Sequence, residues 1–131
     1  IMGLYKDHYP DWRENTLKEI YMHIYPSLFL NQYTLNRDED GVYGFTNWAF
    51  LDEKTEQKFL DERSLDIDDW KTGDRTWIID TIYTKEHNIM KFNKTFFTHL
   101  LGPGKTVQWL RLTPLGMIRN HFKVITKEHW L

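Results

Sequence analysis

Arg75-Thr76-Trp77-Ile78-Ile79-Asp80-Thr81-Ile82-Tyr83 is the stretch that decides the fold. It is rich in β-branched and aromatic residues, whose side chains fit the pleated, half-buried surface of a sheet. The stretch is therefore predicted to be a central β-strand. One residue departs from this composition, because the carboxylate of Asp80 stands inside an apolar run. Burying a carboxylate costs free energy unless it is paired, so Asp80 either caps a neighbouring element at a strand end or orients a histidine.

Apolar spacing and turn residues predict the elements on either side. Helical spacing indicates helices over about 16–25, with a restart through Leu30, and over 52–63 and 89–100. β-prone segments indicate strands over 32–37, 42–50, 106–112 and 117–126. Turn sequences at 38–41 and 113–116 join these strands into two hairpins. In the last helix the predicted apolar stripe is Ile89, Phe92, Phe96, Phe97 and Leu100.

This order of elements indicates one fold class. A helix, two strands, a helix, a strand, a helix and two more strands predict an α/β (α+β) protein. Its mixed, mostly antiparallel central sheet would be flanked by helices. A chain of 131 residues is expected to form a single domain over 1–131.

Composition and charge exclude several classes of protein. The 17 Lys and Arg residues stand against 19 Asp and Glu, a net charge of −2, so the basic excess typical of nucleic-acid binders is absent. No apolar run approaches the ~20 residues that span a bilayer, and the first residues contain no apolar signal-peptide core. The lack of cysteine excludes disulfides and a cysteine nucleophile. We therefore expect a cytoplasmic protein without a nucleic-acid partner or a membrane span.

Three kinds of ligand motif are excluded by their spacing. The acidic stretch 66–74 has Lys71 where a calcium loop starting at Asp66 requires glycine. None of the 6 histidines pairs with another at the i, i+4 spacing of a helical zinc site, so no metal is expected. Residues 102–106 lack the phosphate-loop spacing and lead into a strand instead of a helix.

Several segments carry combinations of less common residues. They are Asn31-Gln32-Tyr33-Thr34-Leu35, Arg37-Asp38, Asn47-Trp48-Ala49 and Asp69-Trp70-Lys71-Thr72-Gly73-Asp74-Arg75-Thr76-Trp77-Ile78-Ile79-Asp80. Together they resemble the RTX toxin-activating lysine acyltransferases, the haemolysin-activator family. That family carries an N-Q-Y-x-L…R-D segment, an S-W-A-N-like strand and a D-W-T-S-G-D-R-x-W-F-I-D run. Trp109-Leu110-Arg111-Leu112-Thr113-Pro114 is similar to the A-I-R-V-D-P strand and turn of the family, so the similarity runs from about Pro26 to Pro114.

The resemblance implies a fold and an activity. The fold would be related to the N-acetyltransferases of the GNAT type. The activity would be transfer of a fatty acyl group from acyl carrier protein to an internal lysine of a protoxin-like protein, with no bound cofactor. Acyl carrier protein and the protein substrate would be the partners, and the family's tendency to dimerise makes a homodimer a further expectation.

The resemblance also implies a His–Asp pair. The Asp ends the family's W-F-I-D run, which places it at Asp80. The His lies in an S-P-L-H-x-x-W segment, whose nearest match is Tyr5–Trp12, so His8 is the first candidate for the general base and His23 the second. Candidate substrate-binding residues are Arg75, Trp77 and Arg111; for the two arginines, ordinary charge flanking a strand is the alternative.

Two other functions remain open at this point. Tyr5 stands in place of the family's Ser, and 81–84 in place of its A-P-F-G loop, which favours a catalytically silent GNAT-like protein-binding module. The other alternative is a coenzyme A-dependent N-acyltransferase. The absence of a Q/R-x-x-G-x-G/A pyrophosphate loop counts against it.

Overall fold

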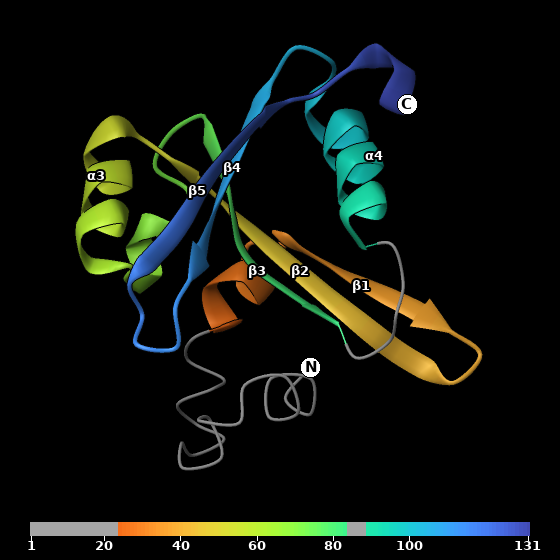
Figure 1. The fold of residues 1–131 in the computed structure, drawn as a ribbon, viewed down its shortest axis with the longest axis horizontal. Helices are drawn as coiled ribbons and strands as arrows, with labels where there is room; N and C mark the ends of the chain where they lie inside the picture. The colour runs from red at the N-terminus through yellow and green to blue at the C-terminus, as the bar shows by residue number, and fades with distance from the viewer. Residues whose placement is uncertain (1–23, 84–88) are drawn as a thin grey trace. The chain divides into compact units, whose positions relative to one another are not determined.

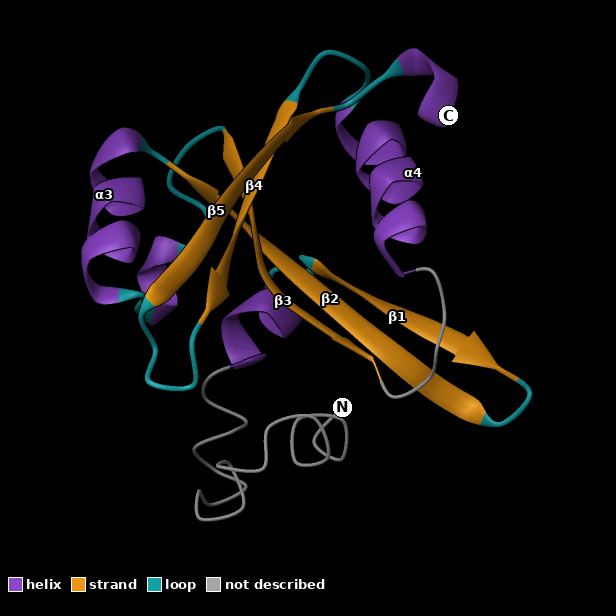
Figure 2. Ribbon diagram, in the orientation of Figure 1, coloured by secondary structure: helices purple, strands orange, loops and turns teal. Residues whose placement is uncertain are grey.

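The computed structural model describes residues 24–83 and 89–131. Five strands form one sheet in the order β1-β2-β3-β4-β5, which makes β3 its central strand, as the sequence predicts (Figure 1). The described residues divide into two compact units, the first made of 24–48 and 80–83 and the second of 49–79 and 89–131. The mixed sheet with helices beside it confirms the predicted α+β class, and it agrees with a GNAT-like fold (Figure 2).

The first unit contains a hairpin and a helical stretch. The hairpin consists of β1 (Tyr33–Asp38) and the beginning of β2 (Gly41–Leu51), paired antiparallel. Its turn forms as predicted, since the Asp40 amide donates to the Asp38 carboxylate at 2.9 Å and Gly41 takes a φ of +113°. The helical stretch at 24–29 includes Pro26, whose carbonyl accepts from the Leu30 amide. The core of this unit is made of Ile24, Phe45 and Ile82.

The second unit contains the remaining elements. They are α3 (Glu53–Glu62), a 3-10 turn at Ile67–Asp69, residues 75–79 of β3 (Arg75–Tyr83), α4 (Ile89–Leu101), β4 (Thr106–Leu112), β5 (Ile118–Ile125) and a 3-10 turn at Glu128–Trp130. Residues 80–83 of β3 belong to the first unit. β4 pairs parallel with β3 and antiparallel with β5. The predicted strands and the helices over 52–63 and 89–100 are confirmed to within about two residues. The helix expected over 16–25 lies almost entirely outside the described residues.

Strand register separates the second unit into two faces. Trp77 pairs with Gln108 and Ile78 with Trp109, so successive residues of β3 and β4 point to opposite sides of the sheet. Trp77 and Gln108 contact Glu56 of α3. Ile78 and Trp109 share a pocket with residues of α4. The helices α3 and α4 therefore cover opposite faces of this part of the sheet (Figure 1).

The buried face of α4 differs from the predicted stripe. Phe97 is buried as expected, but Phe92 and Leu100 are exposed, and Asn93 is buried in their place. The buried positions 93 and 97 lie one helical turn apart and therefore share one face of the helix. Phe92 instead stacks on Phe96, with the ring centroids 5.9 Å apart. Apolar periodicity found the helix but placed its buried face incorrectly, because aromatic rings line more than one side of it.

α3 begins at a side-chain cap, as predicted. The Asp52 carboxylate accepts from the Thr55 amide at 2.7 Å. Hydrogen bonds from Thr55 lower the pKa of this carboxyl below its ordinary 3.8. The cap therefore stabilises the fold above the ordinary pKa, and this stabilisation is lost as the pH falls through the lower, folded-state value.

The acidic stretch 66–74 is held by a lysine. Lys58 of α3 donates to the carboxylates of Asp66 and Asp69, each at 2.6 Å, and these bonds raise its pKa. Within 24–83 and 89–131, no three acidic or histidine side chains are grouped so that they could hold a metal ion. Among the helices of the described residues, none has both the length and the apolarity needed to cross a bilayer.

The structure explains why glycine occupies position 73 of the D-W-x-x-G-D segment. The Phe50 carbonyl accepts from the amides of Thr72 and Gly73, at 2.7 and 3.1 Å, which draws this loop against the end of β2. A Cβ at position 73 would lie 2.6 Å from the backbone N and Cα of Asp52. Because the contact is with backbone, only glycine fits here without displacement.

We expect Gly73→Ala to lower the free energy of unfolding by about 1–3 kcal/mol, because the added methyl group forces the two backbones apart. Urea denaturation followed by tryptophan fluorescence measures this change. The matched control is Asp74→Ala at the exposed neighbouring position, which should stay within about 0.5 kcal/mol of the wild type. Equal stability of the two variants would show that the close approach is not a constraint.

Candidate functional site

Asp80, the predicted catalytic carboxylate, lies half-buried in β3. Its backbone N–H donates to Oδ1 of Asn47 on β2, at 2.8 Å. The backbone position of Asp80 is therefore held by a side chain that lies 33 residues away in the sequence. This bond restrains the direction in which the Asp80 carboxylate leaves the strand.

Asn47 is itself fully buried and makes a second hydrogen bond. Its Nδ2 donates to Oγ of Ser27 at 3.1 Å, and the Ser27 hydroxyl donates to the Ile24 carbonyl at 2.7 Å. One amide side chain thus joins three segments: the helical stretch 24–29, β2 and β3. Buried polar groups of this kind are costly when unpaired. Each residue in this series of hydrogen bonds therefore depends on the others.

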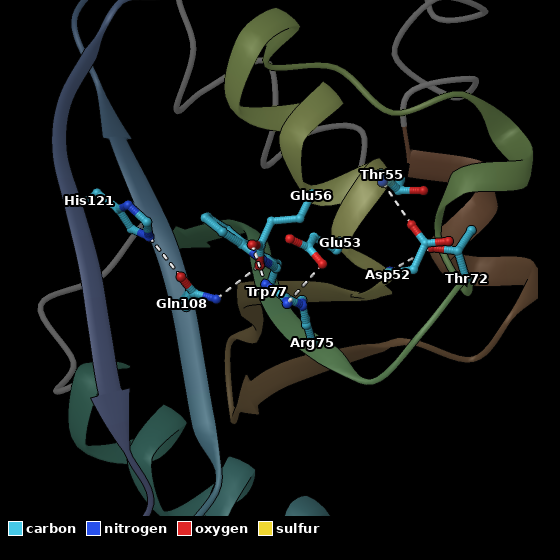
Figure 3. Close-up of polar contacts among 9 residues, drawn as sticks. All are labelled: Asp52, Glu53, Thr55, Glu56, Thr72, Arg75, Trp77, Gln108 and His121. Carbon is cyan, nitrogen blue, oxygen red and sulfur yellow. Dashed lines mark hydrogen bonds and ion pairs between the residues drawn. The ribbon is translucent and has the colours of Figure 1, made fainter.

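A second polar cluster surrounds Glu56 in the second unit (Figure 3). The Glu56 side chain is 13% exposed, and its Oε1 accepts from the Arg75 guanidinium at 2.8 Å. Its Oε2 accepts from the indole N–H of Trp77 at 2.8 Å and from Nε2 of Gln108 at 3.1 Å. The carboxylate therefore binds donors from both β3 and β4.

Gln108 extends this cluster to His121 on β5. Because Nε2 of Gln108 donates to Glu56, its Oε1 is left to face Nε2 of His121 at 2.9 Å. Nε2 of His121 must then carry the hydrogen, which leaves Nδ1 as the ring's acceptor when His121 is neutral. The His121 ring also stacks on Trp77 with centroids 5.1 Å apart, and the Phe59 ring meets Trp77 edge-on with centroids 5.4 Å apart.

The predicted site residues thus fall in different surroundings. Arg75 and Trp77 are brought together on the Glu56 carboxylate, so both have structural partners within the chain. Arg111 is exposed on β4, opposite Asn120 of β5. His8 and His23 lie outside the described residues. The assignment of catalytic and substrate-binding roles to these residues stays a prediction.

Sequence reasoning missed the residues that hold these positions. They are Ser27, Asn47, Glu56, Gln108 and His121. Only Asn47 had a signal, since it belongs to a segment that carries the family resemblance. Nothing local marks Glu56, because a glutamate near a helix N-terminus is ordinary in any exposed helix.

Comparisons with known proteins agree on one family. A family model described as HlyC, the RTX toxin acyltransferase family, matches residues 1–124. The leukotoxin-activating lysine-acyltransferase LtxC of Aggregatibacter actinomycetemcomitans is 34% identical over 84 residues, which are 63% of this chain and 50% of that protein. The RTX-I toxin-activating lysine-acyltransferase ApxIC of Actinobacillus pleuropneumoniae is 38% identical over 74 residues, 56% of this chain and 43% of that protein.

A third relative carries a more specific name. The protein-lysine myristoyltransferase HlyC of Escherichia coli is 39% identical over 62 residues, 47% of this chain and 36% of that protein. In each of these matches the chain spans about half of the curated relative or less.

We expect Asn47→Ala to lower the free energy of unfolding by about 2–4 kcal/mol, because it removes both the acceptor of the Asp80 amide and the buried donor to the Ser27 hydroxyl. Chemical denaturation measures the loss. Asn120→Ala, at an exposed position of β5, is the matched control and should change stability by less than about 0.5 kcal/mol. An Asn47→Ala protein as stable as this control would contradict the role assigned to the amide.

Glu56→Gln should lower the free energy of unfolding by about 1–3 kcal/mol, because the amide offers one acceptor oxygen where the carboxylate offers two. Near-ultraviolet circular dichroism should change as well, since the indole of Trp77 loses a fixed partner. The matched control is Glu53→Gln: its side chain is 88% exposed and lies 3.9 Å from Arg75, so we expect almost no effect. An unchanged near-ultraviolet spectrum in Glu56→Gln would show that Glu56 does not order Trp77.

Proposed function

The chain belongs to the RTX toxin acyltransferase family, and from this premise we propose that it is a protein-lysine acyltransferase. It transfers a fatty acyl group from acyl carrier protein to an internal lysine of a protoxin-like protein. The observation that carries the proposal is the family match over residues 1–124. The names of the relatives support it, since each is a lysine acyltransferase and one is a myristoyltransferase.

The proposed reaction needs a base. A lysine amine has an ordinary pKa of about 10.4 and is almost fully protonated near neutral pH, whereas attack on a thioester requires the neutral amine. A histidine with a pKa near ~6.5 is suited to take the proton. In the proposal this base is His8, with His23 as the second candidate, and Asp80 orients its ring and stabilises the imidazolium.

The bonds change in two stages. The amine nitrogen attacks the thioester carbonyl, and the histidine accepts the proton that the nitrogen loses. The C–S bond then breaks, the thiolate of the carrier leaves, and the histidine returns the proton to it. The chain has no cysteine to form an acyl-enzyme, so the proposal has the acyl group pass directly to lysine.

Support for the role of Asp80 comes from its surroundings. The bond between its amide and the buried Asn47 restrains the strand at this residue, and a group that orients another needs a restrained position itself. Arg111, exposed on β4, is proposed to meet the acidic surface of the carrier protein. Arg75 is proposed to do so as well, but its ion pair with Glu56 competes with that contact.

The proposal includes the whole chain 1–131 as one acyltransferase unit, acting in the cytoplasm where acyl carrier protein is made. The proposal also includes a homodimer, and its support is the family's tendency to dimerise. No bound cofactor is proposed, because the acyl donor brings its own thioester.

Intact-mass spectrometry tests the activity. The protein is incubated with myristoyl-loaded acyl carrier protein and an RTX protoxin, and in parallel with myristoyl-coenzyme A. We expect the protoxin to gain the mass of one or more myristoyl groups with the carrier protein as donor. His8→Ala and Asp80→Asn should slow this gain by roughly a factor of 10²–10⁴, the usual contribution of a general base and its partner.

Matched controls separate chemistry from folding. His99→Ala and Asp74→Asn replace the same residue types at exposed positions and should keep the wild-type rate. Loss of transfer in His23→Ala with full activity in His8→Ala would move the base to His23. No mass gain from either donor, with the protoxin still captured by the protein, would replace the enzyme by a silent binding module, whereas transfer from coenzyme A alone would identify the other donor.

A further inference from the structure

The hairpin of β4 and β5 ends in an exposed apolar turn, residues 112–118, called here the hairpin tip. β5 is the edge strand of the sheet, so the hairpin has a neighbouring strand on one side only. The tip contains no charged residue, and its large apolar side chains are all exposed: Leu112, Leu115, Met117 and Ile118. Leu115 is 90% exposed and Met117 62%. Apolar surface gathered in this way marks a site that contacts another molecule or a membrane.

Positive charge flanks the hairpin tip on both strands. Arg111 precedes the tip on β4 and Arg119 follows it on β5; since Arg111 pairs with Asn120, the two arginines lie at about the same height along the hairpin. Both are exposed, and no ion pair joins either of them to a carboxylate of the described residues. The chain over 105–127 contains no aspartate or glutamate, and its basic residues are Lys105, Arg111, Arg119, Lys123 and Lys127. The base of the tip therefore favours an anionic surface.

The backbone of the tip is largely satisfied within the turn. The Thr113 amide donates to the Met117 carbonyl at 2.8 Å, and the Gly116 amide donates to the Thr113 carbonyl at 2.9 Å. The Met117 amide donates to Oγ1 of Thr113 at 3.2 Å. Pro114 has no N–H, so among 113–117 only the Leu115 N–H is left out of these bonds. Polar backbone groups are costly in hydrocarbon unless they are paired internally, and this pairing favours a lipid surface over a protein partner.

We propose that the hairpin tip docks on an anionic phospholipid bilayer. Its apolar side chains lie below the headgroups, and Arg111 and Arg119 lie at the level of the lipid phosphates. Residues 112–113 carry the turn up to about 7 Å beyond Arg111, at ~3.4 Å for each extended residue. Peripheral segments bury their apolar side about 5–10 Å into the boundary between headgroups and acyl chains, so the length of the tip fits this depth. The inference is independent of the proposed function, because it uses none of the proposed catalytic residues.

Vesicle flotation of the full chain tests the docking. We expect the wild type to float with phosphatidylcholine–phosphatidylglycerol vesicles and much less with phosphatidylcholine alone. Binding should weaken as the salt concentration rises, because salt screens the attraction between the arginines and the lipid phosphates.

Two apolar residues of equal size give a matched pair of variants. Leu115→Asn should weaken vesicle binding by roughly tenfold or more, because it removes an inserted apolar side chain. The control is Ile67→Asn, at a 52% exposed position of the 3-10 turn after α3. It should bind within about twofold of wild type, a change smaller than the loss of one buried methylene group.

The charge at the base of the tip has its own test. Arg119→Gln should weaken binding about fivefold, the usual contribution of one arginine near an anionic membrane. Lys54→Gln removes the same charge from an exposed position of α3 and should bind as the wild type does. Arg111 is left unchanged, because the proposed function assigns it to the carrier protein. Equal affinities for Arg119→Gln and Lys54→Gln would contradict the placement of the arginines at the lipid phosphates.

Insertion of the tip has a direct readout. The chain has no cysteine, so a single introduced one can be labelled selectively. Leu115→Cys that carries an NBD fluorophore should shift its emission to the blue on phosphatidylcholine–phosphatidylglycerol vesicles, and lipids brominated on their acyl chains should quench it. Ile67→Cys with the same label should show neither change.

Two results would overturn the inference. One is vesicle binding by Leu115→Asn that equals that of the wild type, and the other is an emission at position 115 that vesicles do not change. If acyl carrier protein shifts this emission while vesicles do not, the tip docks on an acidic protein and the lipid proposal is wrong. Failure of the proposed function looks different, since His8→Ala and Asp80→Asn should bind vesicles as tightly as the wild type whether or not the wild type transfers an acyl group.

Discussion

The second unit depends on the pairing of one carboxylate, Glu56. It is mostly removed from water, so its charge is tolerated only because donors from Arg75, Trp77 and Gln108 surround it. The donors depend on it in turn, since the indole N–H of the fully buried Trp77 has its hydrogen bond here. This mutual dependence fastens α3 to β3 and β4 and, through Gln108, orients His121 on β5.

β3 separates three tasks by the alternation of its side chains. Arg75 and Trp77 point toward Glu56, Ile78 packs with residues of α4, and Asp80 is held through its amide by Asn47. Neighbouring residues of a strand face opposite sides of the sheet. A structural ion pair, an apolar wall and a proposed catalytic group can therefore follow one another within six residues without competing for the same space.

Local chemistry explains which predictions succeeded. The turn at Gly41 and the cap at Asp52 each depend on a few neighbouring residues, so both can be read from the sequence. β3 was predicted because its β-branched and aromatic residues fit a buried strand. The buried face of α4 was placed incorrectly, since several faces carry aromatic rings and only packing decides that Asn93 and Phe97 turn inward. The role proposed for His8 came from family resemblance alone, whereas for Asp80 the resemblance chose between two interpretations that its place in an apolar strand had left open.

The strands from β1 to β5, the helices α3 and α4, the family and the candidate carboxylate Asp80 can all be predicted from local propensity and from motifs of neighbouring residues. The contacts that hold these elements cannot: Arg75, Trp77 and Gln108 share Glu56, and Asn47 holds the backbone of Asp80. These contacts join residues from 19 to 52 positions apart in the sequence, as from Arg75 to Glu56 and from Gln108 to Glu56. Strand register and helix packing bring such residues together, and neither is encoded in any short segment of the chain.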